Sequence, residues 1–371
     1  MEDLEMKGLF NNVFEGKTVL VTGHTGFKGS WLSIWLRELG ANVIGYALEP
    51  YTVNDNFVVA KVGSKIRSNI GDIEDYGKLK RVFDEYQPEI VFHMAAQSLV
   101  RLSYKQPKLT YDTNVGGMVN LLECCRLTDP VKVIINVTSD KCYENKEWIW
   151  GYRENDPVGG YDPYSSSKAC SEIITSAYRN SFFNAKEYSK AISSVRSGNV
   201  IGGGDWREDR LVPDCIKALR NNKPIGIRSP TSVRPWQHVL EPLSGYLLLA
   251  SRMYEDREKY SGAWNFGPAH GSIITVEELV RSLIKYWGGG QYNDLSKGLS
   301  REPHEARSLM LDISKAITLL DWRPILSINE AIEYTVSWYK ASNVDYDFCV
   351  SQINDYVGRL MKRRRTGSNA G

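Results

Sequence analysis

A short apolar strand that runs directly into three glycines is the feature that most constrains the fold of this chain. Residues 17–22 favour a strand, Gly23, Gly26 and Gly29 follow at a spacing of three, and a helical pattern begins at residue 31. Glycine lets the backbone approach a pyrophosphate closely, and the free N–H groups of a first helical turn face an anion. The segment therefore predicts a dinucleotide-binding strand, turn and helix rather than a glycine-rich surface turn.

Short apolar strands alternate with amphipathic helices through the first half of the chain. The expected strands lie at residues 17–22, 42–47, 66–69, 89–94, 132–138 and 191–196. The helical patterns between them lie at residues 27–39, 74–86, 107–127 and 164–182. This alternation predicts an α/β Rossmann fold, in which a doubly wound parallel sheet binds its ligands beyond the carboxyl ends of the strands.

The pattern changes after residue 196, where three consecutive glycines at 202–204 predict a loop. Shorter elements follow it, with helices expected at 212–221, 237–253, 275–287, 328–343 and 346–361 and strands near 225–228 and 263–266. We therefore expect a dinucleotide-binding domain over residues 1–196 and a smaller, mixed α/β substrate-binding lobe over residues 197–371, with segments that can interleave.

Composition excludes several classes of protein. The net charge of +2 gives no indication of a nucleic-acid-binding protein. No apolar run reaches the roughly 18 residues of a membrane span, and the acidic N-terminus lacks a leader, so a cytoplasmic protein is expected. The six cysteines lack Cys-x-x-Cys spacing, which predicts reduced thiols and no metal site. The basic run 362–365 can bind nucleic acid or an acidic membrane, but a solvated tail is the simpler interpretation.

Tyr164 and Lys168 stand four residues apart at the start of an expected helix, so they share one helix face. A lysine ammonium beside a phenol lowers the tyrosine pKa from about 10, which makes the phenol an acid/base for alcohol–ketone interconversion. An exposed helix pair is the structural alternative. Tyr104 and Lys108 repeat the spacing, but Pro107 disrupts the helical geometry between them.

Together these motifs resemble the extended short-chain dehydrogenases/reductases over nearly the whole chain. Within that superfamily the chain is most similar to the nucleotide-sugar 4,6-dehydratases, and among these to the enzymes that act on CDP-glucose. The segments that carry the resemblance are Thr22–Gly29, Gly71–Ile73, His93–Gln97, Asn114, Thr138–Lys141, Tyr164–Lys168 and Ser197–Trp206. The resemblance implies a lyase with NAD as cofactor and a nucleotide sugar as substrate.

The resemblance also assigns cofactor contacts. They fall on Gly23, Thr25, Gly26, Phe27, Lys28, Gly29, Asp72, Ile73, Ala95, Ala96, Gln97, Asn114, Tyr164 and Lys168. NAD-binding folds usually carry an acid at the end of the second strand, where this chain has Ala47, with Glu49 two residues later. Residues 41–60 contain no Lys or Arg to meet a 2′-phosphate, so NAD is favoured over NADP.

The triplet Ser139-Asp140-Lys141 favours a dehydratase over an epimerase. Dehydratases of this superfamily typically have Thr-Asp-Glu there, so Lys141 departs from the pattern and leaves the C5 base open. Elimination needs one group to remove the C5 proton and another to protonate the leaving C6 hydroxyl. Asp140 can be the acid if burial raises its pKa, and Lys141 can be the base if burial keeps it neutral. A structural ion pair between the two is the alternative.

The resemblance places the sugar nucleotide against Gln97, Ser98, Ser139, Asn199, Arg210, Leu211, Arg234, Arg301 and His304. Two arginines from separate segments can hold a diphosphate, although each alone is more typical of a protein surface. The expected reaction converts CDP-glucose to CDP-4-keto-6-deoxyglucose. The alternatives are a GDP-mannose or dTDP-glucose dehydratase, a 4-epimerase, and a catalytically silent NAD-binding protein.

Two expected helices carry more apolar residues than a single buried face requires. These residues are Val115, Met118, Val119 and Leu122 on the first helix, and Ala169, Ile173, Ile174 and Ala177 on the second. Family members pair such helices across a two-fold axis, so the resemblance implies a homodimer or a dimer of dimers. The alternative is that both faces pack on the sheet of one subunit.

Overall fold

Seven parallel strands form the centre of the computed structural model, which describes residues 6, 8–184, 189–296 and 309–368. From one edge the strands are β3 (Arg67–Ile70), β2 (Asn42–Ala47), β1 (Thr18–Thr22), β4 (Ile90–His93), β5 (Val133–Val137), β6 (Ala191–Arg196) and β10 (Gly262–Asn265). Every pairing in this sheet is parallel. The strand order reverses between β1 and β4, which is where a doubly wound sheet binds its ligand. The predicted Rossmann fold is confirmed.

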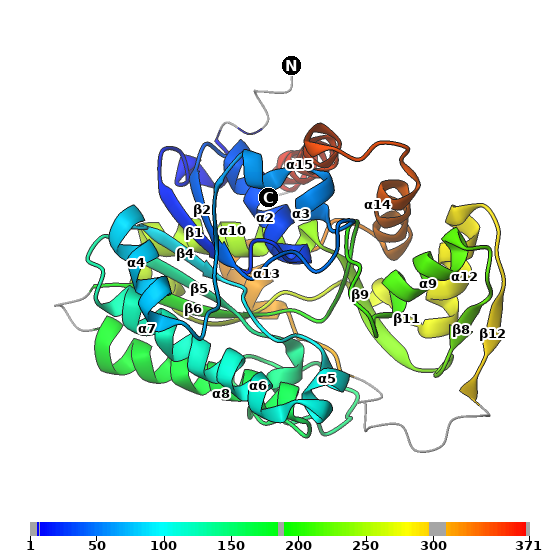
Figure 1. The fold of residues 1–371 in the computed structure, drawn as a ribbon, viewed down its shortest axis with the longest axis horizontal. Coiled ribbons are helices and arrows are strands. Elements are labelled where there is room, and N and C mark those ends of the chain that lie inside the picture. The colour runs from blue at the N-terminus through cyan, green and yellow to red at the C-terminus, as the bar shows by residue number, and fades with distance from the viewer. Residues whose placement is uncertain (1–5, 7, 185–188, 297–308, 369–371) are drawn as a thin grey trace.

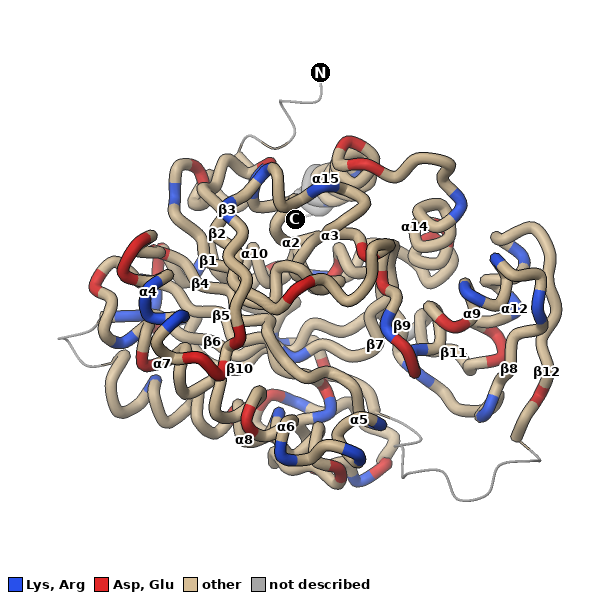
Figure 2. Tube along the Cα trace, viewed as in Figure 1, with Lys and Arg blue, Asp and Glu red and all other residues tan. Residues whose placement is uncertain are grey.

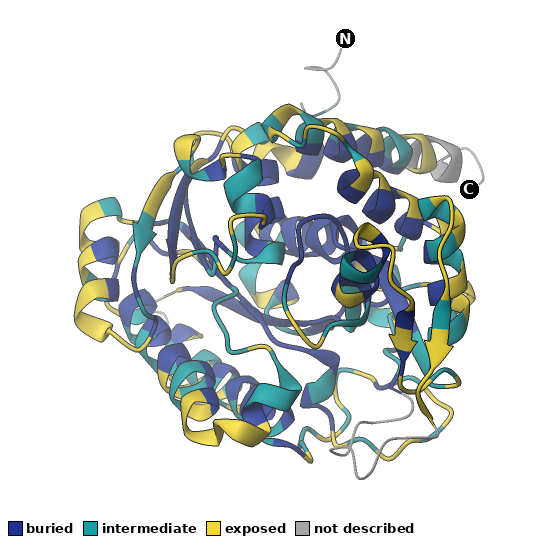
Figure 3. Ribbon diagram, turned by 45° about the vertical axis from the view of Figure 1, so that its right-hand side comes forward, coloured by how far each residue is buried: buried dark blue, intermediate teal, exposed yellow. Residues whose placement is uncertain are grey.

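Helices cover both faces of the sheet, and alternate side chains of each strand feed the two layers (Figure 1). Val19 and Val21 of β1 share a core with α2 (Phe27–Glu38) and α10 (Leu240–Glu255). The intervening Leu20 belongs to a second core, which includes side chains of α4 (Tyr76–Tyr86) and α7 (Gly117–Arg126). The central strands β1, β4 and β5 are buried on both faces, as Figure 3 shows, so they appear in the sequence as continuous apolar runs, whereas the edge strand β3 is polar and partly exposed.

Helix α8 (Pro163–Tyr178) lies beside α7 (Figure 1). The expected helix over 107–127 is divided in the structure. It consists of α6 (Pro107–Tyr111), a π-helical turn at Asp112–Gly116 and then α7, and it is preceded by α5 (Val100–Lys105).

A smaller lobe lies to the right of the central sheet in Figure 1. Its helices are α9 (Leu211–Arg220), α12 (Val276–Trp287) and α14 (Ile328–Lys340). Its strands form two small sheets: β8 (Ile225–Ile227) with β12 (Tyr292–Asp294), and β7 (Asn199–Ile201) with β9 (Val233–His238) and β11 (Ile273–Thr275).

The boundary expected between residues 196 and 197 does not separate two units of chain. After β7 and β9 the chain returns to the central sheet, because α10 packs on β5 and β6 and β10 pairs with β6. The C-terminal helix α15 (Tyr346–Ser368) then packs on α2. The two lobes are therefore interleaved in sequence.

Acidic and basic residues occur in both lobes, as Figure 2 shows, in keeping with the small net charge. Among residues 8–184, 189–296 and 309–368, no helix is long and apolar enough to cross a membrane.

Candidate active site

The turn between β1 and α2 is closed so tightly that only glycine fits at two of its positions. Gly23 has a φ of +73°, and a Cβ there would lie 2.8 Å from the backbone nitrogen of Ala95. A Cβ on Gly29 would lie 2.1 Å from the carbonyl oxygen of Gly23. Gly26 is the N-cap of α2, whose first turn holds no acidic residue. The result is a backbone cradle at a helix N-terminus, directly over the switch point of the sheet.

Other residues expected at the cofactor support this cradle. Thr25 Oγ1 donates to the carbonyl oxygen of Leu48 at 2.8 Å and so ties the turn to the segment after β2. Ile73 is buried against Gly117, and the Asp72 carboxylate accepts the backbone N–H of Glu74 at 3.0 Å. Phe27 approaches Gly202, where a Cβ would lie 3.0 Å from the phenyl ring.

The end of β2 has no acid next to the cradle. Ala47 is buried and Glu49, two residues on, is exposed. Although residues 41–60 contain no cation, Arg207 from the loop after β7 lies 4.2 Å from the ring centre of Tyr51. Sequence spacing could not reveal this neighbour.

Asn114 and Gln97 are hydrogen-bonded to each other. Asn114 Oδ1 accepts the backbone N–H of Gln97 at 2.8 Å, and its Nδ2 donates to Ser167 Oγ at 2.9 Å. Gln97 Nε2 donates to Thr110 Oγ1 at 2.9 Å, and Oε1 accepts the N–H of Leu99. These bonds hold the loop after β4, which also contains Ala95 and Ala96, against α8. The Gln97 amide is thus engaged by its own loop and by Thr110 of α6.

Lys28 reaches from α2 to the end of β6, where Nζ donates to Ser197 Oγ at 2.8 Å. The same Ser197 oxygen lies 2.8 Å from the Tyr246 hydroxyl of α10, which donates to it. Burial, together with the positive charge of Arg210, lowers the pKa of Lys28 to about 7. This cation lies beside the reacting groups, because the charges of Asp140 and Lys168 both act on it.

Ser139, Asp140 and Lys141 form a short turn at the carboxyl end of β5. Ser139 Oγ donates to Asp140 Oδ1 at 2.9 Å and accepts the N–H of Lys141 at 3.2 Å. Asp140 is buried, and burial raises its pKa against the opposing charge of Lys141. A Cβ on Gly198 would lie 2.8 Å from Asp140 Oδ2, so this carboxylate requires a glycine opposite it.

Tyr164 lies in the first turn of α8, which Asp162 caps by accepting the N–H of Ser165 at 2.9 Å. Burial raises the pKa of Tyr164 to about 12, although a hydrogen bond to Ser139 and the charge of Arg210 lower it. This differs from the expected depression by Lys168, because desolvation of the phenolate outweighs the nearby cations.

Lys168 is anchored away from the phenol. Its Nζ donates to the carbonyl oxygen of Val137 at 3.2 Å. Burial lowers the pKa of Lys168 to about 8, and the carboxylate of Glu172 opposes that shift.

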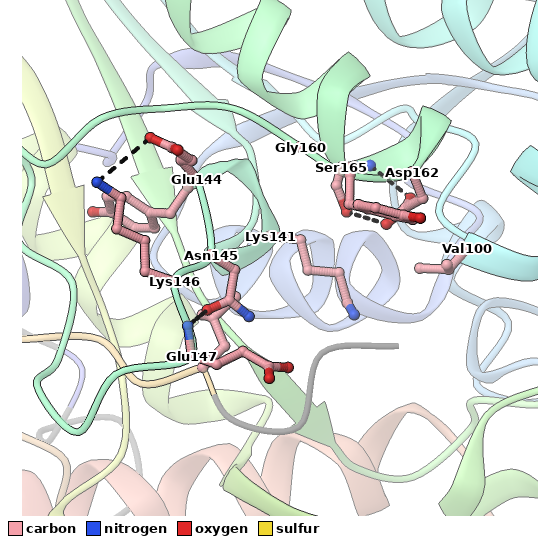
Figure 4. Close-up of a pocket in the computed structure, with 12 residues that line it drawn as sticks. Val100, Lys141, Glu144, Asn145, Lys146, Glu147, Gly160, Asp162 and Ser165 are labelled. Carbon is pink, nitrogen blue, oxygen red and sulfur yellow. Dashed lines mark hydrogen bonds and ion pairs between the residues drawn. The ribbon is translucent and has the colours of Figure 1, made fainter. Parts of the chain in front are cut away.

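Lys141 extends into a cavity of about 520 Å³, between residues 144–147 and the start of α8 (Figure 4). Asp162 and Ser165 face it from the opposite wall. Lys141 is half-buried, so the full burial expected for a neutral amine is not found. The cavity is lined by Val100, Lys141, Tyr143, Glu144, Asn145, Lys146, Glu147, Gly160, Tyr161, Asp162, Ser165 and Leu309.

The residues expected at the substrate come from both lobes. Arg210, the N-cap of α9, forms an ion pair with Asp205 at 2.7 Å and donates to Ser98 Oγ at 2.9 Å, so it connects the lobes. Leu211 begins α9. Asn199 of β7 and Arg234 of β9 lie on neighbouring strands. Arg301 and His304 lie outside the described residues.

Sequence reasoning missed several buried partners of these groups. Asp205 is the counter-ion of Arg210, and Glu172 lies behind Lys168 in an ion pair with Arg196. Glu172 could have been found, because it follows Tyr164 and Lys168 at a spacing of four on the same helix face. No comparable sequence spacing points to Arg196, since its partner Glu172 lies on another element.

A glycine cradle at the switch point, with a buried tyrosine, lysine and serine beside it, defines a dinucleotide-dependent enzyme of the short-chain dehydrogenase/reductase type. The family model described as GDP-mannose 4,6 dehydratase matches residues 20–335, and the chain belongs to that family.

Individual relatives agree with this assignment. The CDP-glucose 4,6-dehydratase of Salmonella typhimurium is 52% identical over 93% of this chain and 98% of its own. The UDP-glucose 4-epimerase of Lacticaseibacillus casei is 28% identical over 87% of this chain and 97% of its own. Among solved structures, the dTDP-glucose 4,6-dehydratase DesIV of Streptomyces venezuelae, solved with NAD, has a TM-score of 0.72 at 25% identity, covering 87% of this chain and 97% of that one. The resemblance to nucleotide-sugar dehydratases is confirmed.

Proposed function

We propose that this protein is a lyase that dehydrates CDP-glucose to CDP-4-keto-6-deoxyglucose. The observation that carries the proposal is the 52% identity to a CDP-glucose 4,6-dehydratase, which extends over 93% of the chain and 98% of that relative. The epimerase match is far weaker, at 28% identity. An acidic residue next to Ser139 also favours dehydration, because elimination needs an acid that epimerisation does not.

NAD is the cofactor of this reaction, and the residues present fit it. A cradle that a Cβ on Gly29 would fill suits a pyrophosphate at the N-terminus of α2. When bound, NAD supplies the hydride chemistry, in which hydride is accepted from C4 of the hexose and returned at C6. Thr25 and Ile73 would support the two ends of the cofactor site.

Oxidation at C4 requires that the O4 proton be removed, and Tyr164 is the group we assign to it. The Ser139 hydroxyl lowers the pKa of this phenol and donates to the buried Asp140 carboxylate at 2.9 Å, so Ser139 acts on both groups. Lys168 keeps a positive charge in the site through its bond to Val137. Arg210 adds a second cation that favours the phenolate.

Elimination of water follows, since the 4-ketone acidifies the C5 proton. Asp140 is suited to protonate the leaving C6 hydroxyl, because burial raises its pKa and so favours the protonated form. Lys141, whose side chain reaches the open cavity (Figure 4), is the candidate we test for removal of the C5 proton, with Asp140 and Tyr164 as the alternatives. Asn199, Arg210, Leu211 and Arg234 are assigned to the nucleotide and diphosphate.

We infer a homodimer formed by α6, α7 and α8, with a cytoplasmic location remaining a prediction. Ile173 on α8 is 58% exposed and Leu109 on α6 is 40% exposed, which supports an apolar contact with a second copy. Met118, Leu122 and Ala169, which the sequence placed on the same surface, are instead buried within the subunit.

A substrate panel tests the function. The purified protein is incubated with NAD and with CDP-glucose, dTDP-glucose, UDP-glucose or GDP-mannose, and the alkaline absorbance of a 4-keto product is followed. We expect product from CDP-glucose alone, and CDP-glucose deuterated at C4 should give product with deuterium at C6. A C4 epimer without a 4-keto product, or product only from another nucleotide sugar, would reject the proposal.

A further inference from the structure

A buried ion pair lies directly behind the proposed catalytic residues. Glu172 on α8 accepts two hydrogen bonds from the guanidinium of Arg196 on β6, from Nε at 2.9 Å and from Nη2 at 2.8 Å. The two side chains are only 5% and 4% exposed. Two hydroxyl groups, those of Thr138 and Ser194, donate to the same carboxylate. The charged pair is therefore fully satisfied, as a buried ion pair must be.

This ion pair holds both ends of the turn at residues 139–141. Thr138, the residue before the turn, is bonded to the carboxylate. Tyr143, at the other end, accepts a hydrogen bond from Arg196 Nη1 at 2.6 Å, and its ring centre lies 4.6 Å from the guanidinium carbon. The Tyr143 hydroxyl in turn donates to Asn265 Oδ1 of β10 at 2.8 Å. Two bonds from one ion pair thus bracket the acid/base triplet.

The backbone hydrogen bonds of the turn itself are weak. Its backbone bonds are long, 3.2 Å from the Cys142 nitrogen to the Ser139 oxygen and 3.3 Å from the Tyr143 nitrogen to the Asp140 oxygen. Strong N–H···O bonds are near 2.9 Å, so these two constrain the turn weakly. A buried ion pair is also a poor source of stability compared with apolar packing. A role in positioning the turn accounts both for its weak backbone bonds and for the presence of a buried ion pair.

We propose that Glu172 and Arg196 are positioning residues for the dehydration, which hold the turn at residues 139–141 from both ends so that its side chains stay aligned with Tyr164. The inference rests on the proposed function. Neither residue touches the substrate in this scheme. A displacement of about 1 Å in a reacting group can lower a rate by about a hundredfold, so loss of one tether should be visible in turnover.

Two variants separate positioning from general stability. Thr138→Val and Ser194→Ala each remove one hydroxyl donor from the same Glu172 carboxylate and leave the ion pair in place, but only Thr138 leads into the turn. In the NAD-loaded enzyme, Thr138→Val should lower kcat for CDP-glucose about tenfold to a hundredfold with KM within about twofold. Ser194→Ala should retain the kcat of the wild type, and Thr138→Ser should restore it.

Tyr143→Phe provides an independent second variant, because it removes the bond at the other end and keeps the ring over Arg196. It should show the same selective loss of kcat. Backbone amide exchange of the peptide containing residues 139–143 should be faster in Thr138→Val and Tyr143→Phe than in Ser194→Ala. Equal kcat and equal exchange in all three variants would overturn the inference. If the wild type forms no product from CDP-glucose, the proposed function fails, and amide exchange alone then decides whether the tethers hold the turn.

Discussion

Tyr164 and Lys168 share one face of α8, yet they serve the site through different neighbours. At neutral pH Tyr164 is protonated in the ligand-free site, because its pKa of about 12 lies well above that pH. Lys168, with a pKa of about 8, carries its charge while bonded to the Val137 carbonyl. The phenol instead meets Ser139, which donates to Asp140. In the proposed mechanism, the reacting groups therefore come from two elements, α8 and the turn after β5.

Removing the phenolic hydroxyl should abolish chemistry without disturbing binding. Tyr164→Phe preserves the buried ring but removes the proton carrier, so kcat should fall by about 100-fold or more while the Kd values for NAD and CDP stay unchanged. Initial rates of 4-keto product and equilibrium titration measure the two quantities. Tyr104→Phe is the control, since that tyrosine is 38% exposed on α5 and should lose less than about twofold. Turnover of Tyr164→Phe within twofold of the wild type would contradict the assignment.

A substitution of Lys141 should separate the oxidation at C4 from the elimination of water. If its amine removes the C5 proton, Lys141→Met should still oxidise C4 but stop before elimination. Single-turnover absorbance should then show bound NADH, and mass analysis should show a 4-keto hexose that keeps its C6 hydroxyl. Lys146→Met is the matched control, because Lys146 lines the same cavity but lies 3.8 Å from Glu144.

Normal dehydration by Lys141→Met would show that Lys141 is instead an ion-pair partner of Asp140. Its charge lowers the Asp140 pKa, so its removal would raise that pKa and make Asp140 a better proton donor.

At the scale of elements, the cofactor site depends on how closely α2 approaches β1. Gly29 lies in the first turn of α2 against the Gly23 carbonyl, with no room for a side chain. The N-terminus of α2 holds no acidic residue that would compete with a bound anion. In the proposed cofactor site, these elements therefore offer a phosphate the backbone N–H groups at the N-terminus of α2.

One methyl group in this turn should remove cofactor binding. Gly29→Ala would place Cβ 2.1 Å from the Gly23 oxygen, so the turn must open and the Kd for NAD should rise at least about tenfold. Calorimetric titration with NAD gives the Kd, and the Tm reports the effect on folding. Gly77→Ala on α4 is the control, because the nearest atom to its Cβ is 3.6 Å away. Wild-type NAD affinity in Gly29→Ala would show that this turn does not hold the cofactor.

Elements differed in how well the sequence predicted them. Strands β1, β4 and β5 of the central sheet were found because each is an apolar run bounded by polar or glycine residues. In the small lobe, β8 was predicted although it has only three residues, whereas β7, β11 and β12, which are equally short, were not, and β9 contains Pro235, which removes the strand signal. In the site, Gly29 and Tyr164 carry local motifs. Arg196 is paired with Glu172, which is distant in sequence, so no local sequence pattern indicates its role.

At the scale of the whole molecule, the two lobes share one apolar core. That core contains Val19 of β1, Leu243 of α10, Leu283 of α12 and Tyr356 of α15. The small lobe thus shares its interior with the central sheet, and Arg210 connects the two lobes by its hydrogen bond to Ser98. The proposed dimer would use the outer face of α6, α7 and α8, which the small lobe does not cover (Figure 1).

A single charge on that outer face should separate the proposed dimer. Ile173 is 58% exposed on α8, so Ile173→Glu should leave the subunit folded while burying an unpaired carboxylate in any two-fold contact. Light scattering at micromolar concentration should give a dimer mass, or a multiple of it, for the wild type and a smaller mass for the variant. Ile149→Glu is the control, since Ile149 is 79% exposed outside these helices and should leave the mass unchanged. A monomeric wild type, or an unchanged mass for Ile173→Glu, would refute this interface.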